Sequence, residues 1–381
     1  MKHHKYDCIR KTIGETCNIL CGYAFDSKLF STDETNIPLI RIRDISRGYT
    51  DTYYIGEYKP EYVVKNGDFL IGMDGEFKIQ KWSGTDALLN QRVCKLYIKT
   101  ENILLPTFLL YFMPKPLKKI EDQTPYVTVK HLSTKKLLDI EIPIPSIKEQ
   151  ERIIDELDCL SNIIDNKKKQ LEELDKLAQA IFYDMFGDPI TNEKGWEVKK
   201  LGDVCKTTSG GTPAKGHSEY YDGGTIPWLR SGEVNKMYIY DTELYITKIG
   251  LEKSSAKWFP ENTVVIAMYG ATVGQVGILK NSMTTNQAIC GIFPNKTFLS
   301  IYLYHFLLSK KQEYLSLAAG GAQPNISQNI VRDTLICCPP NILQQQFAKK
   351  IEAIEKQKEL IKQTLKGLEE LFNSRMDYYF N

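Results

Sequence analysis

The sequence has no long hydrophobic run, no paired-cysteine motif and almost no excess of charge. The longest apolar stretches, such as 263–268, are far shorter than the roughly 18 residues of a membrane-spanning helix, and the basic N-terminus leads into no apolar segment. The nine cysteines show no C-x-x-C spacing and the five histidines are scattered. This pattern disfavours a disulfide framework and a structural zinc site. We therefore expect a cytoplasmic protein that binds no metal and has no signal peptide.

Motifs of DNA-modifying enzymes are also missing. No P-loop is present, and the one adjacent pair of prolines, Pro339 and Pro340, is followed by Asn341, a poor match to the Asn/Asp-Pro-Pro-aromatic loop of DNA amino-methyltransferases. Glycines 270, 274 and 277 have the wrong spacing for a dinucleotide or S-adenosylmethionine fingerprint. We expect no catalytic site in this chain, and no cofactor bound by it.

Length and charge indicate how the chain is divided. At 381 residues it is long enough for two globular domains. The net charge of +2 separates into +3 for 1–145, −4 for 146–187, +2 for 188–338 and +1 for 339–381. We predict four segments with these boundaries: two basic lobes, each followed by a spacer helix. The sign of the lobes suits contact with DNA, although the excess is small.

The two spacer segments carry the same heptad pattern. Apolar residues recur in alternating steps of four and three through 153–185, and the same ladder returns 194 residues later. A period of 3.5 residues over four heptads is typical of a coiled coil, and each helix is predicted to be roughly 50 Å long. The predicted pairing seam consists of Ile153, Leu157, Leu160, Ile164, Leu171, Leu174, Ile181, Phe347, Ile351, Ile354, Ile361, Leu365, Leu368 and Phe372.

Each helix has a single apolar seam, so it requires a partner stripe. The nearest candidate is the other copy, and a molecule of two equivalent halves closes most naturally about a pseudo-two-fold axis. We therefore predict an antiparallel pair. The alternative is that each helix lies on its own domain.

The two lobes repeat one another as well. Residues 37–41 match 226–230, residues 71–73 match 266–268, and the Asn-Gln pair at 90–91 matches that at 286–287. Short β-branched runs at 93–98 and 263–268 predict strands, whereas 104–113 and 299–318 predict helices. The predicted fold class is α+β, with two homologous mixed α/β lobes.

Polar, glycine-rich stretches in the lobes are candidates for contact with DNA. Base edges are distinguished by amide, guanidinium and hydroxyl groups, and phosphates by lysines. The alternatives are solvated loops or turn hydrogen bonds for any one residue, and buried amides that brace a strand for the pairs Asn90-Gln91 and Asn286-Gln287. The candidates are Arg41, Arg43, Lys78, Lys81, Gln91, Arg92, Thr208, Ser209, Thr212, Arg230, Lys236, Tyr269, Thr272, Gln275, Lys280, Gln323 and Asn325.

Several local strings, in one order, carry a family resemblance. They are Gly195-Trp196 before 201–204, and the stretches 73–77, 88–93, 145–157, 224–230 and 269–277. Together with the duplicated helices, they make the chain resemble the specificity subunit of a type I restriction–modification system. The resemblance implies that each lobe is a target-recognition domain that reads one half of a split double-stranded DNA site. It also implies that the helices bind two methyltransferase (modification) subunits, with restriction subunits in the same complex, and that S-adenosylmethionine, ATP and magnesium belong to those partners.

The first lobe departs from the second in two places. It lacks counterparts of 270–274 and of 323–325, and Pro125-Tyr126 is expected where Pro324-Asn325 stands. We therefore predict unlike half-sites, about one helical turn of DNA (roughly 34 Å) apart, with unread base pairs between them. Two other classes stay open: an autonomous DNA-modifying enzyme and a coiled-coil scaffold that binds protein.

Overall fold

The computed structural model describes residues 8–99, 102–124, 130–318 and 325–380. The chain forms two compact units. Unit 1 comprises the residues up to 166 together with those from 364 onward, and unit 2 comprises 167–363. Both boundaries fall within the two long helices, so each unit consists of one lobe and one half of each helix.

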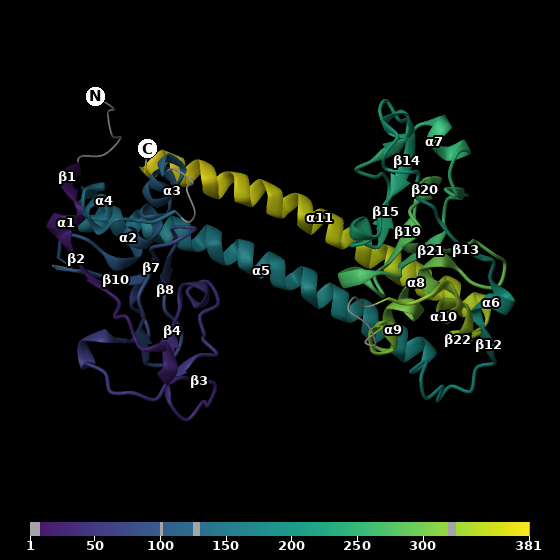
Figure 1. The fold of residues 1–381 in the computed structure, drawn as a ribbon, viewed down its shortest axis with the longest axis horizontal. Coiled ribbons are helices and arrows are strands. Elements are labelled where there is room, and N and C mark those ends of the chain that lie inside the picture. The colour runs from purple at the N-terminus through teal and green to yellow at the C-terminus, as the bar shows by residue number, and fades with distance from the viewer. Residues whose placement is uncertain (1–7, 100–101, 125–129, 319–324, 381) are drawn as a thin grey trace. The chain divides into compact units, whose positions relative to one another are not determined.

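The two long helices are α5 (Ile147–Phe186) and α11 (Asn341–Phe380), each of 40 residues (Figure 1). Within unit 1, Arg375 of α11 forms an ion pair with Glu156 of α5. Within unit 2, Lys358 of α11 donates to Asp175 of α5 at 2.7 Å. The first half of α5 thus pairs with the last half of α11 and the reverse, so the predicted antiparallel pair is confirmed.

Residues of the predicted seam lie on the covered side of both helices. Ile153, Leu157, Ile164, Phe347, Ile351, Ile354 and Leu365 are buried, and the other seven seam residues are half-buried. The same helix sides also pack on the lobes: Ile153 and Leu157 belong to the core of unit 1, and Phe347, Ile351 and Ile354 to the core of unit 2. Each helix therefore packs against its copy and, with one half in each unit, against the lobe of that unit.

Unit 1 is built on an antiparallel sheet of order β2-β10-β7-β8. Helices cover the sheet, and Leu96, Phe108 and Leu117 meet in one core. The strands of this sheet are β2 (Cys17–Cys21), β7 (Phe69–Gly72), β8 (Ile79–Lys81) and β10 (Val93–Ile98), and the helices are α1 (Ile13–Thr16), α2 (Pro106–Phe112), α3 (Pro114–Gln123) and α4 (Thr134–Leu138). A second sheet contains β3 (Phe30–Ser31), β4 (Ile37–Ile40), β5 (Tyr53–Tyr54), β6 (Val63–Val64) and β9 (Ala87–Leu89), while β1 (Cys8–Thr12) pairs with β11 (Glu141–Pro145).

Unit 2 repeats this plan. Its larger sheet has the order β13-β21-β18-β19-β15 and packs against α8. The strands are β13 (Thr207–Ser209), β15 (Tyr238–Ile239), β18 (Val264–Ala267), β19 (Val276–Leu279) and β21 (Ile289–Ile292), and the helices are α6 (Leu201–Val204), α7 (Lys248–Glu252), α8 (Ser300–Ser309), α9 (Lys311–Ala318) and α10 (Gln328–Asp333). The second sheet contains β14 (Ile226–Leu229), β16 (Tyr245–Ile246), β17 (Trp258–Phe259) and β20 (Met283–Thr285), while β12 (Val198–Lys200) pairs with β22 (Leu335–Cys337).

Strand order and strand direction show that one fold is used twice. The order β2-β10-β7-β8 in unit 1 corresponds to β13-β21-β18-β19 in unit 2. Each second sheet contains one parallel pair, β4 with β9 and β14 with β20. The predicted α+β class with two homologous lobes is confirmed.

A buried glutamine joins each long helix to its lobe by the same three bonds. The side chain of Gln150 accepts from Leu105 N–H (2.8 Å) and donates to the carbonyls of Ile103 (2.7 Å) and Pro145 (2.9 Å). Gln344 repeats the set with Leu299 (2.9 Å), Thr297 (3.0 Å) and Pro339 (3.0 Å). Both side chains are fully buried. We call each set the glutamine bracket; it fixes the first turn of a spacer helix on the chain that enters α2 or α8.

Candidate nucleic-acid interface

Parallel strands bring two turns of each lobe to the same edge. In unit 1, Leu39 and Ile40 of β4 run parallel to Leu88 and Leu89 of β9. In unit 2, β14 and β20 are parallel in the same way, and the N–H of Asn286 donates to Leu229 O at 2.9 Å. Because parallel strands end on the same side, the turns that follow them emerge together. We call this side of each lobe the reading edge.

The first turn of the reading edge is held by a carboxylate. In unit 1, Asp44, fully buried, accepts from the N–H of Arg41 at 2.9 Å, and Arg43 lies 3.6 Å from it. In unit 2, Glu233 accepts from the N–H of Arg230 at 3.1 Å. The turn therefore has the same construction in both lobes, and in each an arginine follows the strand at once.

The second turn carries the Asn-Gln pair and comes close to a neighbouring strand. A Cβ on Gly22 would lie 2.0 Å from Asn90 O, and one on Gly210 would lie 2.2 Å from Thr285 O. Only glycine fits at these two points. Asn90 is buried, as the buried-amide alternative expected, whereas Gln91 beside it is exposed. Asn286 has a buried Oδ1 without a hydrogen-bond partner among the described residues.

The third part of the reading edge is a hairpin turn that meets a segment from late in the lobe. In unit 2, Ile326 N–H donates to Met268 O at 2.9 Å, and Tyr269 forms a β-bridge with Asn325. In unit 1, Leu132 N–H donates to Met73 O at 2.7 Å, and Asp74 forms a bridge with His131. His131, not Tyr126, is therefore the counterpart of Asn325, so the expected alignment was wrong here. Pro125-Tyr126 lies outside the described residues.

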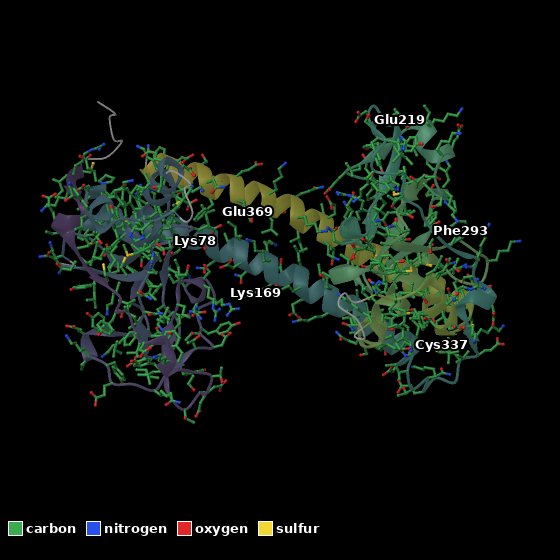
Figure 2. The ribbon with its side chains drawn as sticks, in the orientation of Figure 1. Lys78, Lys169, Glu219, Phe293, Cys337 and Glu369 are labelled. Carbon is green, nitrogen blue, oxygen red and sulfur yellow. The ribbon has the colours of Figure 1, made fainter. Side chains whose placement is uncertain are left out.

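The same register corrects the expectation for the hairpin loop. Gly72 N–H donates to Lys78 O at 3.1 Å, and Ala267 N–H donates to Gln275 O at 2.9 Å, so Lys78 corresponds to Gln275. Residues 75–77 of unit 1 therefore stand where unit 2 has 270–274, so the expectation that these residues lack counterparts was wrong except for a difference of two residues in loop length. The side chain of Lys78, labelled in Figure 2, is exposed and lies 2.5 Å from Glu76.

In unit 1 the reading edge contains a small charged cluster. Asp74 accepts from Arg92 at 2.6 Å and lies 2.6 Å from His131 Nδ1. Its side chain is only 17% exposed, whereas Arg92 and His131 are mostly exposed. Arg92 has a positive φ of 74°, an uncommon conformation for a residue with a side chain. Asp74 thus orients two cationic or hydrogen-bonding groups toward solvent at this edge.

In unit 2 several candidates of the reading edge are hydrogen-bonded to other side chains or backbone atoms of the lobe. Arg230 donates to Glu243 at 2.5 Å as well as to Glu233, Thr212 is hydrogen-bonded to Gln287, and Ser209 donates to Gln328 at 2.9 Å. Thr208 accepts from Lys257 at 2.8 Å, and Thr272 donates to Tyr269 O at 3.0 Å. Tyr269 is exposed, and Thr272 and Gln275 are half-buried.

Three candidate lysines lie elsewhere. Lys81 pairs with Phe69 at the far end of β8, and Lys280 follows the far end of β19, over the Tyr238 ring. Lys236 lines a groove against α5 and α11. These lysines stay predictions for phosphate contact, but they do not share the reading edge. Gln323 lies outside the described residues.

Sequence reasoning missed His131, Glu243 and Lys257. His131 could have been found, because it precedes Asn325 by 194 residues, the same offset that relates the two helices. Glu243 and Lys257 carry no such signal, since their contacts with Arg230 and Thr208 come from tertiary packing.

The groove of unit 2 has a volume of about 1240 Å³ and is lined by α5, α8, α11 and residues 235–240. His305 lies on its wall, packed against Phe182 and Phe347, with Nε2 buried and without a hydrogen-bond partner among the described residues. Burial, aided by nearby Lys358, lowers the pKa of His305 to about 4. The imidazole is therefore neutral in the folded protein near neutral pH.

The described residues contain neither a cluster of metal-binding side chains nor a helix that could span a membrane. Across 8–99, 102–124, 130–318 and 325–380, no three His, Cys, Asp or Glu side chains gather closely enough to hold a metal ion. Over the same ranges, every helix is too short or too polar to span a bilayer.

Comparisons with known proteins agree on one family. The model of the type I restriction modification DNA specificity domain matches twice, at 8–176 and 193–370. The EcoBI specificity subunit of Escherichia coli is 29% identical over 331 residues, which cover 79% of this chain and 69% of that protein. The MjaIX specificity subunit of Methanocaldococcus jannaschii is 29% identical over 241 residues, which cover 58% of this chain and 55% of that one. The chain thus spans between about half and two thirds of the lengths of these relatives.

Solved structures share the fold at low identity. The S subunit of a type I restriction–modification system from M. genitalium has a TM-score of 0.55 and 14% identity, covering 100% of this chain and 98% of its own. A chain from a study of complex assembly and conformational transition of the type I R-M system has a TM-score of 0.59 and 18% identity, covering 98% and 97%.

Proposed function

Since the chain belongs to the type I restriction–modification DNA specificity family, we propose that its two reading edges each bind one half of a split double-stranded DNA site. A specificity subunit is the recognition component of its system and not the catalyst. The reading edge of unit 1 would take one half-site and that of unit 2 the other.

One observation carries this proposal: the same backbone presents different side chains in the two lobes. Asp74 and Tyr269 share one position, and His131 and Asn325 share the facing one. Lys78 and Gln275 occupy a third. Side chains that differ in donors and acceptors select different base edges, whereas a common backbone keeps the docking alike. The two half-sites should therefore differ in sequence and be approached in the same way.

Exchanging the hairpin loops tests this proposal. We replace 73–78 of unit 1 with the sequence of 268–275 and determine the modified sites by methylome sequencing in cells that carry the partner subunits. We expect the letters of one half-site to change and those of the other to stay. Lys81→Ala and Lys280→Ala, at the far ends of the same sheets, are the controls; they should weaken binding without changing any letter. If the bases of both half-sites stayed the same after the loop exchange, the proposal that the reading edge selects bases would be wrong.

We also propose that the paired helices set the number of unread base pairs between the half-sites. The antiparallel pairing within each unit and the bracket at the start of each helix support this role. Deleting four residues, about one helical turn, from 164–170 should change the tolerated spacer and leave both half-sites as they are. Altered half-site letters in methylome sequencing would contradict it.

The remaining assignments are proposals about the assembly. Two methyltransferase subunits would bind the outer faces of the helix pair, together with lobe edges, and restriction subunits would join the same complex. S-adenosylmethionine, ATP and magnesium would be bound by those subunits and not by this chain. We place the assembly in the cytoplasm, where its DNA substrate is found.

A further inference from the structure

Two cysteines of unit 1 face each other across neighbouring strands. Cys21 of β2 is the direct partner of Cys94 of β10 in the antiparallel register. The hydrogen bonds at both ends of this strand pair show which residue pairs are hydrogen-bonded: Gly22 N–H donates to Val93 O at 2.9 Å, and Lys99 N–H donates to Thr16 O at 2.9 Å. Hydrogen-bonded and non-hydrogen-bonded pairs alternate along an antiparallel ladder, so Cys21 and Cys94 form a non-hydrogen-bonded pair.

That type of pair has the geometry of a disulfide. Its Cα atoms lie about 4.5 Å apart and its side chains point to the same face of the sheet, which is within the range that a disulfide spans. Cys21 and Cys94 form no disulfide in this structure, so the pair is present in its reduced form.

The two sulfur atoms differ in accessibility. Cys21 lies on the edge strand β2 and is exposed, with its Sγ 3.7 Å from Thr134 Oγ1. Cys94 lies on the inner strand β10 and is fully buried. Burial, with a smaller contribution from neighbouring Cys21, raises the pKa of Cys94 to about 12. A reagent from solvent therefore meets Cys21 first, and Cys94 can respond only from within the fold.

Unit 2 provides a matched comparison at the same position. There Ser209 stands opposite Cys290 in the equivalent pair of strands, β13 and β21. Ser209 donates to Gln328 in the first turn of α10, as Cys21 contacts Thr134 in the first turn of α4. The backbone thus accepts serine in place of the exposed cysteine, and only unit 1 has two sulfur atoms at this site.

We propose that Cys21 and Cys94 are a redox-modification site that closes to a cross-strand disulfide when the chain meets a small-molecule disulfide. The Cys21 thiolate attacks one sulfur of the reagent, its S–S bond breaks, and the first thiol leaves. The sulfur of Cys94 attacks Cys21 Sγ of the mixed disulfide, the mixed S–S bond breaks, and the departing thiolate takes the proton of Cys94 and leaves as the second thiol. Two protein thiols are oxidised and one reagent disulfide is reduced to two thiols, so the electrons balance.

The cross-link would fix the edge strand next to the reading edge of unit 1. Cys21 precedes Gly22, which approaches the Asn90 turn, and Cys94 follows Arg92 by two residues. Oxidation should therefore slow amide hydrogen exchange in 17–23 and leave the equivalent strand β13 of unit 2 unchanged. The modification itself does not depend on the proposed DNA function, and its test uses no DNA.

The test uses the full-length reduced chain and oxidised glutathione. After oxidation, free thiols are alkylated and counted, and the digest is analysed by mass spectrometry. We expect the nine thiols to fall to seven, with a peptide that links Cys21 to Cys94, and dithiothreitol to reverse both changes. Cys21→Ser, which copies unit 2, should abolish the link, whereas Cys159→Ser, at an exposed cysteine of α5, should retain it.

A gain-of-function variant completes the test. Ser209→Cys places a second sulfur opposite Cys290 and should yield a second cross-linked peptide under the same conditions. A stable glutathione adduct on Cys21 with Cys94 still free, or links among other cysteines that survive Cys21→Ser, would overturn the proposal.

Discussion

Replacing Gln344 with leucine should destabilise unit 2 far more than an ordinary core substitution of similar size. The change removes the partner of three backbone groups, the N–H of Leu299 and the carbonyls of Thr297 and Pro339; the bond to Pro339 is buried and the other two are partly buried. An unpaired buried group costs about 1–3 kcal/mol, and leucine returns about 1 kcal/mol through apolar burial. Because two of the three groups are only partly buried and lose less, we expect a net loss of about 2–4 kcal/mol in the free energy of unfolding.

Urea denaturation followed by tryptophan fluorescence measures this loss. Three of the four tryptophans, Trp196, Trp228 and Trp258, belong to unit 2, so the signal reports chiefly on that unit. With a urea dependence of about 2–3 kcal/mol per molar, the midpoint should fall by roughly 1–2 M. The control is Gln345→Leu, at an exposed neighbour whose amide contacts only Asn341 among the hydrogen bonds found; it should shift the free energy by no more than about 0.5 kcal/mol. Equal midpoints for the two variants would refute the reasoning.

Two further predictions concern pH. His305 has its pKa lowered from 6.5 to about 4 by burial, so the unfolded chain binds the extra proton first and stability should fall as the pH drops below about 6.5. His305→Leu should remove about 2 kcal/mol of the difference between the unfolding free energies at pH 7 and pH 5, measured by urea titration; an unchanged difference would contradict the burial argument. Glu156 has its pKa lowered, first by the hydrogen bond from Arg375, so its contribution is present above its ordinary pKa and is lost as the pH falls through the lowered value. Glu156→Gln should cost about 1 kcal/mol at pH 7 and almost nothing once the pH is below the lowered pKa of Glu156. Circular dichroism of both proteins during acid titration measures this cost, and a cost that persists in acid would point to packing instead.

The spacer helices could be predicted from sequence because their signal is local and periodic. A heptad ladder specifies a helix and its apolar face, and the second copy supplies the partner. The duplicated lobes were found for a related reason: short strings around Arg41 and Arg230 kept their order, and the structure shows why, since the buried Asp44 and the mostly buried Glu233 hold the same turn.

The residues of the reading edge were harder to predict because they are brought together by packing. The Lys78–Gln275 equivalence is set by strand register, because the hairpin loop before these residues differs in length in the two lobes. The positive charge of Lys81 and Lys280 predicts contact with phosphate, but residue type does not tell at which end of a strand a side chain lies. Both lie at the ends away from the hairpin loop. The sequence predicts Arg230 as a side chain that contacts bases, yet the structure shows it bound to the carboxylates of Glu233 and Glu243. These two residues are ten positions apart in the chain.

The glutamine bracket has a consequence for how such a chain can diversify. All three of its partners in each unit are main-chain atoms, so the joint between helix and lobe is indifferent to the side chains at those positions. A lobe whose sequence changes extensively can stay attached to its helix through the glutamine bracket as long as its backbone keeps the same path. Mutations can thus change the base sequence that a lobe prefers without changing how the lobe is attached to its helix.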